Sequence, residues 1–456
     1  MNEGAARNER RIGGLSLDFW RFWSGQAIST LGSAFTSFAI PLLIYKLTGS
    51  AVNLGLATAS TMLPYLFFGL IIGAWVDRLD RKRLMIVTNC LLAAVAASTP
   101  ILYAAGMLSV WWLYLAGFLG STLFIFFNSA EYAALPSLVP TDDLTAANGR
   151  IEASYSTAFI IGPVLAGGLS ALVPLPDLFL VDAASYLIAA LTLLLVRGSF
   201  NQRSEEPKEP TNIRQDVVEG LRYVLGHPVL RNISLMMAMV NFVSVTFGTQ
   251  LVLFAKERLA ASNSEIGLLF AAEGAGIVAL SLLAGPLRKR WSFSRVALTA
   301  LASEGVCIMV VAFTRSFWLA VPLFGLSAGL GILFNINTRS VRQAIVPNHM
   351  LGRVMSIASV LAWSAIPVGS FLGGIAIQRT GNVALVYGAI GIFTVIIPIM
   401  FSFTALGHAD RAVAGGATGA VGHRDERGRH GLELADRPPE LPLAVVGLGR
   451  EELEGE

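Results

Sequence analysis

Charged side chains are scarce in this sequence: 14% of its 456 residues are Asp, Glu, Lys or Arg, against about 25% in an ordinary soluble domain. The net charge of +3 is too small to indicate a nucleic-acid partner. Only two cysteines occur, Cys90 and Cys307, and both lie in apolar stretches, which excludes a disulfide framework. No cysteine or histidine pair has metal-site spacing, so no metal site is predicted.

Two kinds of enzyme motif are also missing or misplaced. None of the five lysines follows a glycine, so the chain lacks the phosphate-binding loop of an ATP-driven pump. Residues 325–329, GLSAG, fit the pattern of a serine-hydrolase nucleophile. That motif requires a turn between a strand and a helix, whereas these residues lie in the middle of an apolar run. We therefore do not expect an enzyme.

What the sequence has in abundance is long apolar runs, since 54% of its residues are hydrophobic. A bilayer is crossed by about 20 apolar residues in a helix that satisfies its own backbone hydrogen bonds. We predict an all-α membrane protein with twelve transmembrane helices, at residues 19–45, 52–75, 84–105, 109–131, 151–173, 178–196, 230–254, 264–286, 294–313, 317–338, 354–377 and 383–405. The predicted parts are a cytoplasmic N-terminus at 1–18, a six-helix bundle at 19–196, a linker at 197–229, a second six-helix bundle at 230–406 and a disordered tail at 407–456.

The basic residues predict the orientation of these spans. With twelve spans, 28 of the 33 Lys and Arg residues lie on the side of the N-terminus. Because cytoplasmic loops carry the excess of positive charge, we expect both termini in the cytoplasm and the protein in the cytoplasmic (inner) membrane. In the linker Ile213, Val217, Leu221 and Leu225 recur every four residues, which predicts an amphipathic helix on the cytoplasmic membrane surface.

The two halves of the chain repeat each other. At an offset of 207 residues Asn128 matches Asn335, and at an offset of 212 Gly73 matches Gly285. The first offset also aligns Gly162 with Gly369 and Gly167 with Gly374. Two pseudo-symmetric bundles enclosing a central site are typical of secondary transporters. The alternative is that small residues and basic loops recur in any multi-span protein.

One loop carries a recognisable motif, GLIIGAWVDRLDRKR at residues 69–83. It resembles the loop signature of the major facilitator superfamily, although Asp80 stands where that pattern usually has glycine. The resemblance implies that the loop aspartate docks against the start of the eleventh span and stabilises the outward-facing state. The residues that match this conformational switch are Gly73, Asp77, Arg78, Arg81 and Lys82. The alternative is a solvated positive loop.

A second motif lies in the fifth span, IGPVLAGG at residues 161–168. It resembles the signature of superfamily exporters that work by antiport, through Gly162, Pro163, Gly167 and Gly168. Its counterpart in the eleventh span contains Gly369, Gly373 and Gly374. Small residues at this spacing also let two helices approach closely, and helix packing alone is the competing explanation.

Several stretches resemble the drug and macrolide efflux permeases, a branch that includes siderophore exporters; one is LVPTDDLTAANG. The resemblance implies a monomeric exporter of small amphipathic molecules that works in the lipid bilayer by alternating access. The proton motive force would supply the energy, and no cofactor is expected. A lipid, lysolipid or siderophore transporter on the same fold is the alternative, followed by a membrane scaffold or sensor.

Acidic residues inside spans are costly and so are candidates for function. Glu273 is the candidate proton carrier or counter-charge for a cationic drug, with a structural hydrogen bond as the alternative. For Asp182 and Glu304 we expect a packing or capping role. Glu131, at the end of the fourth span, is a candidate partner of Arg339 in an ionic gate. Further polar candidates for the cavity are Gln26, Asn128, Asn241, Gln250, Asn335 and Asn337, with Phe124, Phe127, Met236 and Met239 as apolar companions.

Overall fold

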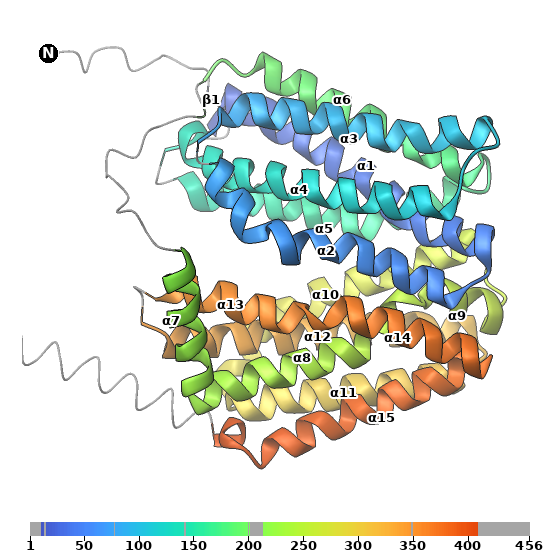
Figure 1. Ribbon diagram of the computed structural model, residues 1–456, viewed down its shortest axis with the longest axis vertical. Helices are drawn as coiled ribbons and strands as arrows, with labels where there is room; N and C mark the ends of the chain where they lie inside the picture. The colour runs from blue at the N-terminus through green and yellow to red at the C-terminus, as the bar shows by residue number, and fades with distance from the viewer. Residues whose placement is uncertain are drawn as a thin grey trace, which may run out of the picture. The chain divides into compact units, whose positions relative to one another are not determined.

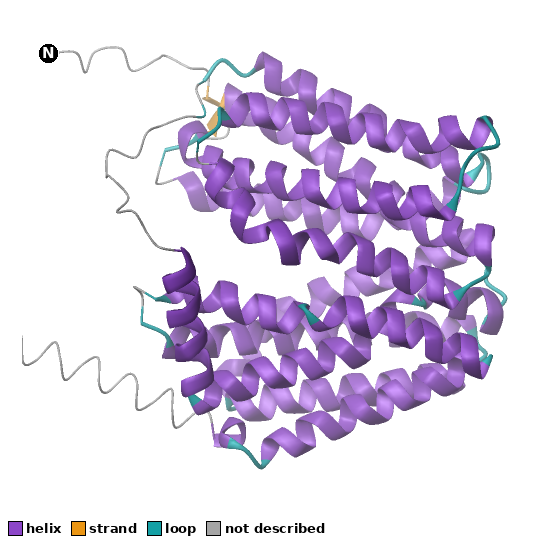
Figure 2. Cartoon of the chain, viewed as in Figure 1, coloured by secondary structure: helices purple, strands orange, loops and turns teal. Residues whose placement is uncertain are grey.

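The structure is a computed structural model that describes residues 11–12, 15–76, 78–140, 143–198, 200, 213–347 and 350–408. In these ranges the chain is almost entirely helical, and the only strands are the antiparallel pair β1 (Arg11–Ile12) and β2 (Leu15–Ser16) (Figure 2). Residues 201–212 of the predicted linker and the predicted tail from residue 409 onwards lie outside the described residues.

The first bundle contains the predicted spans one to six (Figure 1). Its helices are α1 (Leu17–Thr48), α2 (Ala51–Val76), α3 (Arg81–Ala104), α4 (Val110–Leu138), α5 (Leu144–Leu169) and α6 (Leu178–Leu195), with a 3₁₀ turn η2 (Leu175–Asp177) before α6. Packing of α1 and α3 against α6, and of α2 against α4, closes this bundle around the buried aromatic residues Phe19 and Phe22.

The second bundle contains the predicted spans seven to twelve. Its helices are α8 (Pro228–Thr249), α9 (Leu251–Arg258), α10 (Asn263–Arg290), α11 (Phe293–Phe313), α12 (Phe317–Ile345), α13 (Leu351–Trp363), α14 (Ala365–Thr380) and α15 (Val383–Ser402), followed by the turn η3 (Ala405–His408). The seventh span is interrupted at Gln250, between α8 and α9, and the eleventh at Ser364, between α13 and α14.

Local sequence explains where several of these helices start. Side-chain oxygens at the helix N-caps accept hydrogen bonds from backbone N–H groups of the first turn, which otherwise have no partner. Such caps are Ser16, Asp80, Ser109, Ser262, Ser292 and Asn382. Gly49 and Gly381 end α1 and α14 in the left-handed conformation, with φ of 58° and 60°.

The predicted twelve-helix fold is confirmed, and hydropathy alone accounts for eleven of the spans in the described part of the chain. The twelfth, α5, is not among the eleven because Arg150, Glu152 and Tyr155 dilute the apolar character of its first half. Its packing identifies it instead, because α5 lies against α1 of its own bundle and α10 of the other.

Several predicted helix ends are wrong by one or two turns. The fourth helix was predicted to stop at residue 131, but α4 continues to Leu138, and α12 continues to Ile345 instead of 338. The fifth stops at Leu169, before the predicted residue 173. A helix can continue past its apolar run because backbone hydrogen bonding does not require apolar side chains. Glu131 therefore lies inside α4, seven residues before its last residue, and does not end it.

The amphipathic helix in the linker is α7 (Ile213–Gly226). Its apolar residues Leu221 and Val224 pack against α13, where Val354 and Ile357 belong to the same buried cluster. Glu219 also pairs with Arg353 at 3.1 Å. The expected membrane surface is thus replaced, at this face, by the protein itself.

Candidate functional site

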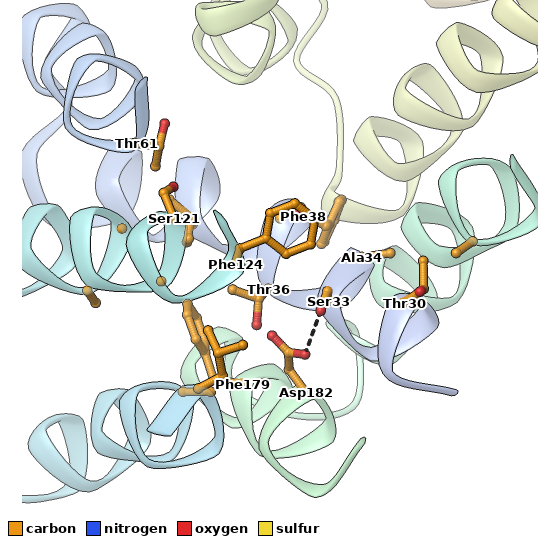
Figure 3. A pocket seen from close by; sticks show the side chains of 18 of the residues that line it. Thr30, Ser33, Ala34, Thr36, Phe38, Thr61, Ser121, Phe124, Phe179 and Asp182 are labelled. Carbon is orange, nitrogen blue, oxygen red and sulfur yellow. Dashed lines mark hydrogen bonds between the residues drawn. The ribbon is translucent and has the colours of Figure 1, made fainter. Parts of the chain in front are cut away.

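The main cavity, of about 520 Å³, is built chiefly from the first bundle. All six of its helices contribute side chains, and α10 of the second bundle adds Phe270 and Glu273. Most of the lining is apolar or aromatic, including Phe38, Phe124 and Phe179 (Figure 3). The polar residues of the lining carry hydroxyl or carboxyl groups and are Thr30, Ser33, Thr36, Ser37, Thr61, Thr99, Ser121, Tyr155, Asp182, Tyr186 and Glu273.

Asp182 is the more enclosed of the two cavity carboxyl groups, with 2% of its surface exposed. The hydroxyl of Ser33 lies 3.1 Å from Asp182 Oδ1 and 2.9 Å from the hydroxyl of Tyr186. Figure 3 shows Ser33 and Thr36 of α1 beside the Asp182 carboxyl group of α6. We expected a packing or capping role for Asp182, but α6 turns it towards the cavity. The rule that acids in spans are functional candidates was the signal that favoured it.

Glu273 reaches the cavity from the other bundle. It lies on α10 one turn after Phe270, which makes an edge contact with Phe38 of α1 at 6.1 Å between ring centroids. In the described part of the chain the Glu273 carboxyl group has no hydrogen-bond or ion-pair partner. The structural hydrogen bond that we considered as its alternative role is therefore absent among these residues.

A second, smaller cavity of about 60 Å³ adjoins the first, and we call it the annex. Gln26 lies in its wall, as does Asn89 of α3, a residue that the sequence analysis did not single out. Gln26 is 8% exposed and Asn89 1% exposed, and the amide nitrogen of each has no hydrogen-bond partner. Tyr155 and Tyr186 line both cavities, so the annex and the main cavity share these two walls.

Several polar candidates lie away from the two cavities. Asn128 and Asn335 are exposed, and Asn335 bonds the Gly331 carbonyl oxygen of its own helix. Asn337 is buried but bonds Leu333 on the same helix, and Asn241 ties α8 to the Ala362 carbonyl oxygen of α13.

The apolar candidates divide in the same way. Phe124 lines both cavities and Phe127 lines the annex. Met236 is fully buried in the second bundle, and Met239 is half-buried outside the cavities. Glu304 on α11 also lies outside the cavities, with Oε2 unpartnered beside Gly331 of α12.

The proposed ionic gate is not formed. Glu131 is 5% exposed, its carboxyl group lies near the side chain of Tyr155, and its Oε1 has no hydrogen-bond partner. Arg339 is exposed on the surface of α12. Burial of Glu131 within the first bundle separates it from the expected partner.

The glycine motifs lie where helices come closest. A Cβ atom at Gly167 of α5 would lie 3.1 Å from the carbonyl oxygen of Asn263, the first residue of α10 in the other bundle, whereas one at Gly168 would meet nothing within 4 Å. Gly267 of α10 lies against Pro163, and the hydroxyl of Ser264 bonds the Gly167 carbonyl oxygen at 3.1 Å. These residues form one seam between the bundles, α5 against α10.

The repeat-related residues form the second seam, α14 against α2. A Cβ atom at Gly374 would lie 2.6 Å from the carbonyl oxygen of Ala51, and Gly55 of α2 lies against the Ser370 carbonyl oxygen. Gln250, fully buried, donates to the same Ala51 carbonyl oxygen at 2.7 Å.

The remaining motif glycines hold helices together within each bundle. Gly162 lies against Ala34 of α1, and its counterpart Gly369 lies against Phe242 of α8. Gly373 faces Thr246, also on α8. The repeat inferred from the sequence is therefore realised in the contacts, because matching glycines meet matching helices.

Both seams lie towards the end of the bundles that is remote from the termini. In the described ranges, the hydrogen bonds between the bundles join Ser50 to Gln378, Thr58 to Thr249, Gln250 to Ala51, Ser264 to Gly167 and Ser370 to Gly55. The helix ends near α7 and the termini contribute none of them. Within the described residues, hydrogen bonds thus join the bundles at one end only, the end remote from the termini (Figure 1).

The loop between α2 and α3 lies at the opposite end. Arg81 donates to the carbonyl oxygens of Ala133 and Phe200, and Lys82 donates to the Val196 carbonyl oxygen at 2.6 Å. Asp80, the departure from the superfamily pattern, caps α3 by accepting from Arg83 N at 2.8 Å. Arg78 is exposed. Asp77 and the surroundings of Gly73 lie outside the described residues, so docking of the loop aspartate stays a prediction.

Comparison with known proteins identifies a family and its fold. A family model described as "transmembrane secretion effector", within the major facilitator superfamily, matches residues 15–414. Macrolide efflux protein A of Streptococcus pyogenes is 26% identical over 369 residues, covering 80% of this chain and 90% of that protein. The multidrug efflux pump Tap of Mycolicibacterium fortuitum is 27% identical over 359 residues, covering 75% and 85%.

Two solved structures show the same fold at low sequence identity. The nucleoside transporter NupG superposes with a TM-score of 0.71 at 12% identity, covering 86% of this chain and 99% of that one. A bacterial homologue of the iron transporter ferroportin, in its inward-facing state, gives a TM-score of 0.65 at 19% identity, covering 85% and 98%.

Proposed function

This chain belongs to the transmembrane secretion effectors of the major facilitator superfamily, and from that premise we propose that it is a proton-coupled exporter of amphipathic small molecules. Its relatives include a macrolide efflux protein and a multidrug efflux pump, so the chain is an efflux-type transporter. The finer proposal names the substrate class, the energy source and the direction.

The observation that carries the proposal is the composition of the main cavity. A volume of about 520 Å³ falls within the usual range of small-molecule sites, about 300–1,000 Å³. Phenylalanine side chains supply adaptable apolar surface, and few polar groups fix the orientation of a ligand. Such a site suits bulky amphipathic molecules better than sugars or other densely hydroxylated solutes.

The position of Glu273 supports a cationic substrate. A carboxyl group without a partner in an apolar wall is costly as an anion, and a bound ammonium group offsets that cost. Since Phe270 and Glu273 belong to the second bundle and the rest of the cavity lining to the first, a substrate whose amine binds Glu273 would touch both bundles at once. Binding would then depend on how the bundles are arranged, which is the requirement for alternating access.

The single closed end supports a transport cycle. We place both termini and the open end in the cytoplasm, because the basic residues are concentrated on that side. The seams formed by α5 with α10 and α2 with α14 then close the cavity towards the exterior of the inner membrane. In this state substrate enters from the cytoplasm, and opening of the seams releases it.

Purified protein in liposomes tests the proposal directly. Ethidium and erythromycin serve as probes, a planar cation and a macrolide. A pH step that makes the compartment receiving the probe acidic should drive accumulation of both, and a protonophore should abolish it. Accumulation that ignores the pH step, or that protein-free liposomes reproduce, would contradict proton-coupled export.

A further inference from the structure

The first bundle contains two enclosed carboxyl groups, that of Asp182 in the wall of the main cavity and that of Glu131 outside it. Asp182 is 2% exposed and Glu131 is 5% exposed. No lysine or arginine bonds either of them in the part of the chain that the structure describes. A carboxyl group enclosed in this way costs less free energy when it holds a proton. Both residues are therefore suited to take up and release protons rather than to attract a fixed cation.

Two hydroxyl groups, those of Ser33 and Tyr186, connect Asp182 to the wall of the annex. Ser33 lies between Asp182 Oδ1 at 3.1 Å and the Tyr186 hydroxyl at 2.9 Å. Because the serine hydroxyl has one proton, it can donate to one of these atoms while it accepts from the other. A continuous hydrogen-bonded chain thus joins Tyr186, Ser33 and Asp182. A proton can pass along it when donors and acceptors exchange roles.

The annex extends from this hydrogen-bonded chain towards Glu131. Its lining includes Tyr155, whose side chain lies near the Glu131 carboxyl group. A volume of about 60 Å³ holds about two water molecules at about 30 Å³ each. The unpartnered amide nitrogens of Gln26 and Asn89, buried in the same wall, are donors that such waters would satisfy.

The line from Asp182 to Glu131 runs along the helix axes rather than across them. Asp182 is four residues from the first residue of α6, about 6 Å from the closed end of the bundles. Glu131 is seven residues from the last residue of α4, about 10 Å from the open end. The two carboxyl groups therefore lie at different depths, one towards each side of the membrane.

We propose that Asp182 and Glu131 are the two proton-holding groups of a single hydrated path through the first bundle, joined by Ser33, Tyr186, the annex and Tyr155. This inference rests on the proposed proton-coupled export. It assigns the coupling proton to the first bundle and leaves Glu273, in the second, to bind the substrate. No proton is consumed, because a proton that binds at one carboxyl group is released from the other.

The other titratable groups around the path are consistent with this assignment. Tyr65 of α2 and Glu152 of α5 face Tyr155, and Tyr155 faces Tyr186. Arg81 of α3 is bonded to the carbonyl oxygens of Ala133 and Phe200. The remaining polar contributions of α1 and α3 to the annex are the uncharged Gln26, Ser29, Thr30, Ser33 and Asn89.

The test separates proton coupling from substrate movement. Asp182→Asn and Glu131→Gln remove the proton-holding groups with little change in size, and Glu304→Gln removes a buried carboxyl group outside the cavities as the matched control. Exchange of labelled erythromycin across liposomes without a pH gradient should continue in Glu131→Gln and Glu304→Gln, which lie outside the main cavity. For Asp182→Asn, in the cavity wall, pH-driven accumulation is compared with the exchange rate of the same variant. Accumulation driven by a pH step, relative to exchange, should fall at least tenfold in Asp182→Asn and Glu131→Gln and stay unchanged in Glu304→Gln.

The tyrosines test the path itself. Tyr155→Phe and Tyr186→Phe keep the aromatic rings and delete only the hydroxyl groups, so substrate-dependent proton flux, followed with a pH-sensitive dye inside the liposomes, should slow several-fold. Full pH-driven accumulation by Asp182→Asn and Glu131→Gln, or undiminished proton flux in both tyrosine variants, would overturn the inference while leaving proton-coupled export standing. Loss of exchange in Glu131→Gln would also overturn it, because it would assign Glu131 to substrate binding or to structure. If the unsubstituted protein ignores the pH step, the proposed function fails as well.

Discussion

At the scale of single residues, three acids in the spans differ in their surroundings. Glu273 faces the cavity without a partner, Asp182 is bonded to Ser33 in the cavity wall, and Glu304 lies in the second bundle against Gly331. The sequence ranks all three as costly and therefore as candidates. Only their neighbours separate a substrate-binding role from a proton-holding one, and each role has its own experimental signature.

Replacement of Glu273 by Gln should impair transport of cations selectively. The amide keeps the size of the side chain but cannot offset a positive charge, so export of ethidium should fall at least tenfold. Erythromycin uptake measured at a pH where its amine is largely neutral should change less than threefold. The measurement is initial uptake into proteoliposomes, with Glu304→Gln as the control. Equal losses for both probes would argue against a counter-charge at this position.

Arg81 in the loop between α2 and α3 should stabilise the first bundle. Its guanidinium group donates to Ala133 and Phe200, and hydrogen bonds from a charged donor contribute about 1.5–3 kcal/mol each where they are shielded from water. Because Arg81 is half exposed, we expect Arg81→Ala to lower the free energy of unfolding by about 1–2 kcal/mol. Thermal unfolding in detergent measures this, and Arg78→Ala, at an exposed position, should match the unsubstituted protein.

At the scale of helices, the two seams are built from matching parts of the repeat. Gly167 of α5 meets the start of α10, and Gly374 of α14 meets the start of α2. Side-chain hydroxyl and amide groups then bond backbone carbonyl oxygens across the seams, as Ser264 does with Gly167 and Ser370 with Gly55. Apolar packing accompanies these polar contacts, because one buried cluster contains Leu42 of α1 together with Phe254 of α9 and Ile266 of α10. Opening of the closed end therefore separates apolar as well as polar contacts.

Adding a side chain at Gly167 should weaken the closed end. Valine there meets Asn263, Ser264 and Gly267, whereas valine at Gly168 points into open space. We expect Gly167→Val to shift the protein towards the state that is open to the exterior and to lower transport at least fivefold. Gly168→Val should transport normally. Labelling of a cysteine placed in the cavity, by a reagent that does not cross the membrane, measures the opening, and equal labelling of both variants would refute the seam.

At the scale of the whole transporter, the hydrogen bonds between the bundles lie at one end in the described ranges. Ser50 and Gln378, on opposite bundles, are 3.0 Å apart at that end. The cavity lies between this closed end and the open one, with walls from both bundles. Transport by alternating access therefore requires the Ser50–Gln378 contact to break in every cycle.

A covalent link at that contact should stop transport. We expect a Ser50→Cys, Gln378→Cys double variant, in a chain whose native Cys90 and Cys307 are replaced by Ala, to lose more than 90% of its transport on crosslinking. A reducing agent should restore it, and each single cysteine variant should be unaffected by the crosslinker. Uptake of ethidium into proteoliposomes measures the effect. Full activity of the linked protein would exclude separation of the bundles at this end.

The number of spans, the two-fold repeat and the family could all be predicted from the amino-acid sequence. In lipid each apolar run must satisfy its own backbone hydrogen bonds, so length and hydropathy are sufficient to place a helix. The fifth span was likewise predicted at 151–173 from its apolar run, although the polar first half of α5 makes it the least apolar of the twelve. Helix ends were predicted less well, because the helices continue beyond the hydrocarbon layer.

The side chains that share a cavity could be identified only from the folded protein. A transmembrane helix that is apolar on all sides gives little sign of which face points inwards, so Asn128 and Asn335 were as good candidates as Gln26. Ser33, Tyr155, Tyr186 and Asp182 lie up to 153 residues apart along the chain, and packing of α1 against both α5 and α6 brings them together. Convergence of this kind depends on how each helix is rotated against its neighbours, which no local pattern of residues specifies.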